Sequence, residues 1–177
     1  MWTSWWGEEM RKAKEEALCA MMLALALALS YMERLIPLQM VVPLPGIKLG
    51  LANIVTLVVL YTLKTRYAFL ILIPRCCFTA AFGGGATGFW FSLCGGLLAL
   101  GAMALGKKTG RFSVYGVSML GAAAHNIGQI MAAMVLMNSV YIGAYLPYLL
   151  LVAIVAGLLT GGICAGVLRV LPKGVTQ

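Results

Sequence analysis

Apolar residues fill this chain in long runs, each of which ends at glycine, proline or a charged residue. Six such segments lie at about residues 17–35, 49–63, 67–84, 87–106, 114–137 and 146–169. A helix rises 1.5 Å per residue and needs about 20 residues to cross a bilayer. An alternating strand pattern is absent, and helices satisfy their own backbone hydrogen bonds in lipid. The pattern predicts an all-α integral membrane bundle of six transmembrane helices, the second of them short.

The two ends of the chain differ from the segments between them. Residues 1–16 contain several tryptophans and charges of both signs, with Glu8 and Lys12 spaced for one helix face. We expect a cytoplasmic or interfacial N-terminal helix that leads, uncleaved, into the first span. Residues 17–171 then form one six-helix membrane domain, and residues 172–177 form a cytoplasmic tail.

Composition and charge support this assignment and add an orientation. Hydrophobic residues make up 62% of the 177 residues and charged residues 10%, whereas a soluble domain carries about 25% charged residues. Ten of the basic residues lie before the first segment, at or after the end of the last, or in the connections 2–3 and 4–5; on the other side only Arg34, at the end of the first segment, and Lys48 are basic. The positive-inside rule therefore places both termini in the cytoplasm. The net charge of +8 is explained by topology, and we expect no nucleic acid as a partner.

The segment GAAAHNIGQIM, residues 121–131, interrupts the apolar pattern with polar side chains. His125 and Gln129 are one helical turn apart on one face, and Asn126 lies at the edge of that face. Arg75, next to Pro74, is a charged residue near the middle of its segment. An arginine there costs roughly 2.5–3.5 kcal/mol on insertion scales, so we expect it to face the bundle interior or a water-filled cavity.

With this topology, the polar residues converge on the outer half of the bundle, where we expect a pocket capped by the proline-containing loop 36–46. The candidate substrate-binding residues are Glu33, Lys48, Asn53, Arg75, His125, Asn126 and Gln129. Structural alternatives stay open for several of them. Arg75 can pair with Glu33 or with carbonyls freed by Pro74, and the polar residues of 121–131 can form interhelical hydrogen bonds.

Several kinds of catalytic site are missing from the sequence. It contains no aspartate, and its glutamates end at Glu33, so it lacks the paired DDxxD motifs that hold Mg²⁺ in prenyl diphosphate synthases. It also lacks a Walker A motif and a convincing nucleophile constellation, and its five cysteines show no metal-ligand spacing. We expect no enzymatic activity, no metal and no cofactor.

Several sequence blocks resemble one known family. They are the run ERLIP…VPLPGIKLGLANIVTL from Glu33 to Leu57, Arg75, SLCGG at 92–96 and GVSMLGAAAHNIGQ at 116–129. Over most of residues 17–171 the chain resembles the Gx transporter family, also labelled heptaprenyl diphosphate synthase component I. That family is similar to the S components of energy-coupling factor (ECF) transporters, six-helix proteins in the plasma membrane of prokaryotes that capture vitamins or other micronutrients.

The resemblance also implies partners. S components work with a transmembrane coupling protein and two cytoplasmic ATPase subunits, and an AxxxA pattern in their first helix meets the coupling protein. Ala20, Ala24 and Ala28 match that pattern, and small residues at this spacing let helices approach closely. The resemblance thus implies a docking ridge at these three alanines.

Three functions are compatible with these observations. The first is the substrate-binding subunit of an ECF-type transporter for a small polar or anionic micronutrient. The second is a non-catalytic membrane accessory of isoprenoid or quinone metabolism, as the synthase label suggests; a link to electron transfer is one form of this alternative. The third is a stand-alone transporter or channel.

Overall fold

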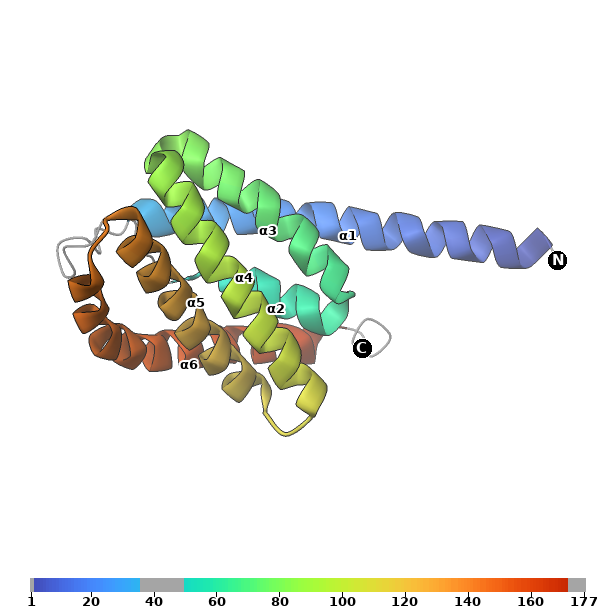
Figure 1. Cartoon of the computed structure of the whole chain (residues 1–177). Coiled ribbons are helices and arrows are strands. Elements are labelled where there is room, and N and C mark those ends of the chain that lie inside the picture. The colour runs from blue at the N-terminus through green and yellow to red at the C-terminus, as the bar shows by residue number, and fades with distance from the viewer. Residues whose placement is uncertain (1, 36–49, 172–177) are drawn as a thin grey trace.

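The computed structural model describes residues 2–35 and 50–171, and this part of the chain folds into a bundle of helices (Figure 1). The α-helices are α1 (Trp2–Leu35), α2 (Asn53–Thr62), α3 (Thr65–Thr79), α4 (Gly85–Thr109), α5 (Val114–Leu136) and α6 (Leu146–Val170). A π-helix, η2 (Ala80–Gly84), joins α3 to α4, and a 3-10 helix, η3 (Val140–Tyr145), precedes α6. No strand occurs within these residues. The expected loop 36–46, Lys48 and the tail 172–177 lie outside the described residues.

Five helices are long and apolar enough to cross a membrane, and α2 is the exception. It has 10 residues and is about 15 Å long, half the thickness of a bilayer core. The helix is therefore shorter than the predicted segment 49–63, because it covers only Asn53–Thr62. Gly50 has a positive φ of 80°, and Leu63 is extended, so the backbone leaves the helical conformation at both ends.

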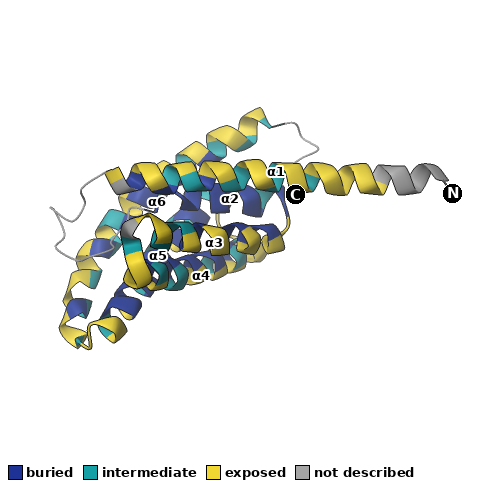
Figure 2. Cartoon of the chain, turned by 90° about the horizontal axis from the view of Figure 1, so that it is seen from above, coloured by how far each residue is buried: buried dark blue, intermediate teal, exposed yellow. Residues whose placement is uncertain are grey.

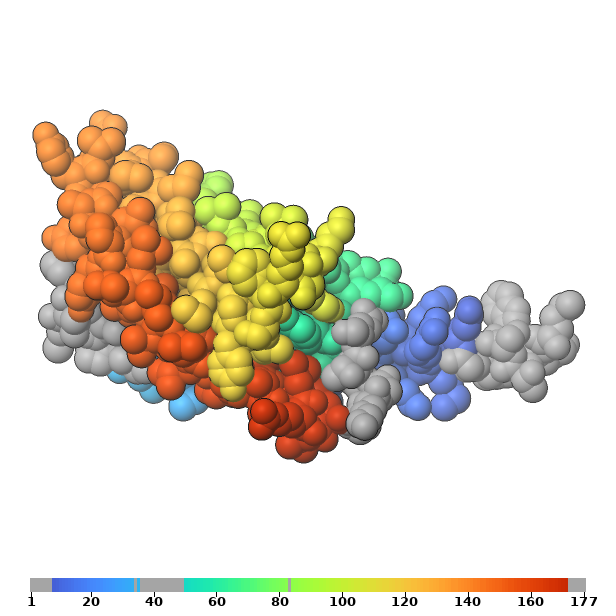
Figure 3. Space-filling view, turned by 90° about the horizontal axis from the view of Figure 1, so that it is seen from below, coloured from blue at the N-terminus to red at the C-terminus, as the bar shows by residue number. Residues whose placement is uncertain are grey.

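Helix α1 is a single helix of 34 residues, so the expected N-terminal helix and the first span are continuous. Its N-terminal part projects beyond the other helices (Figures 1 and 3). Within the bundle it packs against α2 and α3, while most of its surface stays exposed (Figure 2). Ala20, Ala24 and Ala28 are all on that exposed surface.

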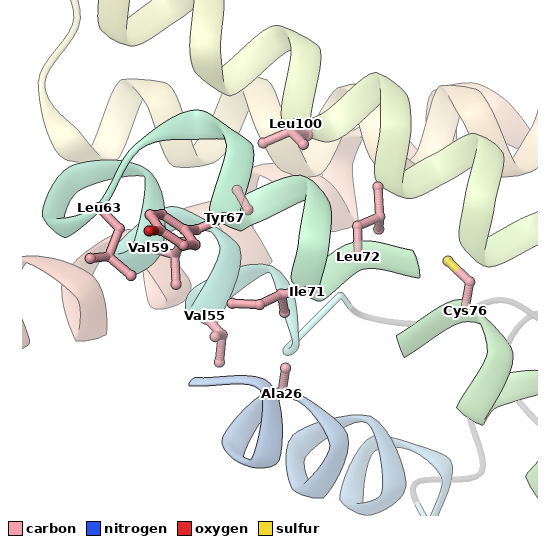
Figure 4. Packing of buried hydrophobic residues seen from close by; sticks show 10 residues of the cluster. Ala26, Val55, Val59, Leu63, Tyr67, Ile71, Leu72, Cys76 and Leu100 are labelled. Carbon is pink, nitrogen blue, oxygen red and sulfur yellow. The ribbon is translucent and has the colours of Figure 1, made fainter. Parts of the chain in front are cut away.

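Helix α2 lies at the centre of the bundle, with nine of its ten residues buried. Val55 and Val59 of α2 pack between Ala26 of α1 and Ile71 of α3 in one apolar cluster (Figure 4). Other α2 residues, including Leu57, join a second cluster with α4, α5 and α6. Because the short helix is packed on all sides, its position is fixed by its neighbours rather than by its own length.

Glycines let the long helices approach one another. A Cβ on Gly128 of α5 would lie 2.6 Å from the carbonyl oxygen of Cys94 in α4, and one on Gly157 of α6 would lie 2.6 Å from the Cα of Met119 in α5. Gly161, four residues after Gly157, is also against α5. This small-residue spacing is typical of close helix packing in membranes, and it brings α4, α5 and α6 together.

The two ends of the bundle differ in charge. We call the end that contains the connections 62–65 and 109–114 the basic end, and the opposite end, where α1 ends and α2 begins, the pocket end. Helix α1 begins and α6 ends at the basic end (Figure 1). There the Nζ of Lys107 donates a 2.7 Å hydrogen bond to the carbonyl of Leu60, and Tyr67 donates a 3.0 Å hydrogen bond to Glu15. The first contact connects α4 to the C-terminal end of α2, and the second connects α3 to α1.

Candidate functional site

The turn into α2 brings a carboxylate to the pocket end. Glu33 is 3% exposed, and its Oε1 accepts a hydrogen bond from the backbone N–H of Gly50. Gly50 adopts the left-handed backbone conformation that glycine favours. A Cβ at this position would lie 3.0 Å from Nδ2 of Asn53. Gly50 therefore permits a tight turn before α2. In this turn Glu33 binds the backbone N–H of Gly50, and the side chain of Asn53 lies next to Gly50.

Arg75 approaches the same place from α3. It is 5% exposed, and its Nη1 donates a hydrogen bond of 3.5 Å to Oδ1 of Asn53. Pro74 lies inside α3 immediately before it and supplies no backbone N–H. The structure thus places Arg75 in the bundle interior, as predicted from the cost of exposing a charge to lipid.

Two adjacent glycines of α4 make room for the polar side chains of α3 and α5. A Cβ on Gly95 would lie 3.0 Å from Nδ1 and Cε1 of His125, and one on Gly96 would lie 3.3 Å from Nη2 of Arg75. His125 also lies near the Gly50 turn, with its Cδ2 3.9 Å from a Cβ built there. The imidazole and the guanidinium therefore each lie against a bare stretch of α4 backbone.

These residues surround a small pocket. It encloses about 250 Å³ of empty space, part of it open to the surroundings. The lining residues come from α1, the α2 turn, α3, α4 and α5, and they are Ser30, Glu33, Gly50, Ala52, Arg75, Thr79, Ser92 and His125. Much of that space is open to the surroundings, and the enclosed part has room for about one water molecule, so the pocket as it stands suits one polar group of a solute.

The structure brings together only some of the predicted site residues. Glu33, Arg75 and His125 line the pocket, and Asn53 contacts Arg75 directly behind it. Asn126 instead donates a 2.8 Å hydrogen bond from Nδ2 to the carbonyl of Leu149. This contact fits the structural alternative, in which Asn126 joins α5 to α6.

Gln129 lies one turn from His125 and does not line the pocket as it stands. Its side chain is 3% exposed. Within the described part of the chain, neither Nε2 nor Oε1 of this amide has a hydrogen-bond partner. The predicted role of Gln129 in binding remains a prediction.

Sequence reasoning missed three hydroxyl residues of the pocket, namely Ser30, Thr79 and Ser92. Two of them could be found by helical spacing. Ser30 precedes Glu33 by three positions and Thr79 follows Arg75 by four, so each shares a face with a recognised residue. Ser92 begins the block SLCGG, and no spacing within its own helix connects it with the other site residues.

The fold and the site define the general class of this protein. It is a helical, multi-pass membrane protein in contact with the lipid bilayer, and it has a buried polar pocket at one end of the bundle. The chain belongs to the heptaprenyl diphosphate synthase component I family, because the family model matches residues 22–167. Searches of curated proteins and of solved structures give no significant match.

Proposed function

We propose that this protein is the substrate-binding membrane subunit of an uptake system, similar to the S component of an ECF transporter. The observation that carries the proposal is the convergence of polar side chains from four helices, α1, α3, α4 and α5, on one largely buried pocket. Membrane helices bury such residues at a cost, and they do so mainly at sites for substrates or ions. In this proposal the pocket takes up a small polar micronutrient.

The proposal also assigns an orientation and partners. The positive-inside rule places the basic end in the cytoplasm, so the pocket opens toward the outside of a prokaryotic plasma membrane. The subunit itself is non-catalytic and takes energy from a transmembrane coupling protein and cytoplasmic ATPases. The alanine ridge on α1 (Ala20, Ala24 and Ala28) supports docking of the coupling protein, because none of the described helices covers it.

Gentle purification from the native membrane followed by native mass spectrometry tests this proposal. We expect a small molecule to be retained by the protein, and ATPase and coupling subunits to co-purify with it. Substitution of His125 with phenylalanine should reduce retention, because the imidazole lines the pocket. Recovery of a well-folded protein without solute and without these subunits would contradict the proposal.

The family description supports a second candidate function. Its wording, heptaprenyl diphosphate synthase component I, indicates a subunit of a synthase with at least one other component. The present chain would then be a membrane accessory of isoprenoid or quinone metabolism, because its sequence has no aspartate with which to build a Mg²⁺–diphosphate site. The same purification distinguishes the two functions: a soluble prenyl diphosphate synthase among the co-purified proteins would favour the second.

A further inference from the structure

The guanidinium of Arg75 is a buried positive charge with few protein partners. Arg75 is 5% exposed and has five N–H donors. Within the described part of the chain it donates one hydrogen bond, of 3.5 Å to Asn53, and Glu33 attracts it electrostatically. All five glutamates of the sequence belong to that part. A charge buried in a membrane bundle needs an anion, a dipole or water beside it.

The surrounding residues hold this guanidinium in place beside the pocket. On one side, Gly96 of α4 lets Nη2 approach the helix backbone, and Leu72 fills the space next to it. On another side, Asn53 of α2 accepts from Nη1. Arg75 also lines the pocket. The N–H donors that no described residue accepts therefore lie beside the pocket.

We propose that Arg75 binds a single carboxylate group of the transported solute. This inference rests on the proposed function and specifies the chemical class of its substrate. The planar guanidinium fork matches a carboxylate through two parallel hydrogen bonds. The side chains of Thr79 and Ser92 line the same pocket, so the carboxylate would enter polar surroundings.

The charges of the pocket favour a carboxylate over a diphosphate. Arg75 is the only basic side chain among the described lining residues, and Glu33, which attracts it electrostatically, offsets its charge. Glu33 lines the same pocket and repels any additional negative charge at short range, where screening by water is weak. A diphosphate would bring several negative charges to described lining residues whose formal charges cancel, whereas a carboxylate brings one.

Thermal melting of the purified, full-length protein with simple salts tests the inference. Sodium acetate, phosphate and diphosphate are each compared with sodium chloride at matched ionic strength, because a ligand that binds only the folded state raises the melting temperature. We expect acetate to raise it above the chloride value and diphosphate to have no such effect. An equal effect of acetate and chloride would overturn the inference, and so would the largest stabilisation by diphosphate.

Variants connect the effect to Arg75. Arg75→Lys keeps the charge but loses the fork, and it should weaken acetate binding about tenfold or more. Arg75→Met should abolish the difference between acetate and chloride. The comparison of acetate with chloride on the wild-type protein needs no variant and keeps the inference testable if the Arg75 variants fold poorly. An undiminished acetate effect in the folded fraction of these variants would overturn the inference.

The inference and the proposed function can fail separately. If the wild-type protein retains a solute and Arg75→Met retains it equally well, the protein binds solute without this carboxylate contact. If acetate stabilises through Arg75 but the wild-type protein retains no solute and no partner subunits, the anion site exists and the proposed uptake function fails.

Discussion

Asn126 and Gln129 lie three residues apart on α5 and are almost equally buried, but only Asn126 has a hydrogen-bond partner among the described residues. A buried amide without partners costs roughly 1–3 kcal/mol, whereas an interhelical hydrogen bond in a membrane contributes about 0.6 kcal/mol on average. The two residues should therefore respond to substitution in opposite directions.

Gln129→Leu should raise the free energy of unfolding of the solute-free protein by roughly 1–3 kcal/mol, because it replaces a buried amide that has no partner with an apolar side chain of similar size. Asn126→Leu is the matched comparison and should lower it by up to about 1 kcal/mol, because the Leu149 carbonyl loses its donor. Melting of both variants in the same detergent measures the effect. A less stable Gln129→Leu protein would mean that this amide is bonded to water or to a solute.

At the scale of the elements, α2 shows how a helix too short to cross the membrane is positioned. Its beginning is held by Glu33 at the Gly50 turn, and near its other end the carbonyl of Leu60 accepts from Lys107. A terminal carbonyl inside a bundle would otherwise lack a partner. The site depends on this arrangement because Asn53, the first residue of α2, contacts Arg75.

Lys107→Met should therefore lower stability by roughly 1.5–3 kcal/mol, the usual range for a hydrogen bond from a charged group. Lys108→Met is the control. Lys108 is exposed, and its substitution removes the same charge from the same end of α4. Chemical or thermal unfolding of the two proteins compares them. Equal stability would show that the contact between Lys107 and Leu60 does not hold α2.

The packing of α4 against α5 gives a second prediction for the elements. Gly128→Ala should destabilise the protein by about 1–3 kcal/mol or more, since its Cβ would meet backbone atoms of Cys94 and Gly95 and backbone cannot move aside easily. Gly101→Ala in α4 meets nothing within 4 Å and should be neutral or slightly stabilising. Melting temperatures distinguish the two. A neutral Gly128→Ala would mean that α4 and α5 can separate without cost.

At the scale of the whole molecule, α1 differs from the other helices because much of its apolar surface is exposed. Ala26 faces the bundle and is fully buried, whereas Ala20, Ala24 and Ala28 face away from it. Substitutions on the two faces should therefore have different consequences. A larger residue at Ala26 should disturb the packing of the bundle, whereas one at Ala20, Ala24 or Ala28 should affect only a partner that packs against α1.

Ala24→Leu should leave the melting temperature and solute retention unchanged but prevent assembly with the proposed coupling protein, because a larger side chain keeps the helices apart. Ala26→Leu is the contrasting variant and should destabilise the bundle itself by about 1–3 kcal/mol. Co-purification and uptake measure the first effect, and melting measures the second. Undiminished assembly of Ala24→Leu would exclude the ridge as the docking surface.

The orientation of the molecule is testable in the same way. A fluorescent reporter fused after Gln177 should be active, and a phosphatase that works only outside the cytoplasm should be inactive, because the basic end is expected to stay inside. The opposite result would place the pocket on the cytoplasmic side and remove the uptake proposal.

The sequence by itself determined the helical membrane class, the approximate helix boundaries and most of the charged site. Long apolar runs in a nearly uncharged chain have few alternatives in lipid, because only helices satisfy the backbone there. For the same reason a residue such as Arg75 had to face inward. These inferences need only local spacing and the cost of burying polar groups.

The tertiary structure decided which polar residues meet. Spacing along α5 groups Asn126 with His125, but the packing of α6 gives Asn126 a partner at Leu149. Likewise, nothing in the local sequence shows that Gly95 and Gly96 face His125 and Arg75. Contacts between helices depend on how each helix is rotated and how closely it approaches its neighbours. Those quantities are set by packing across the whole bundle, and periodicity within one segment does not contain them.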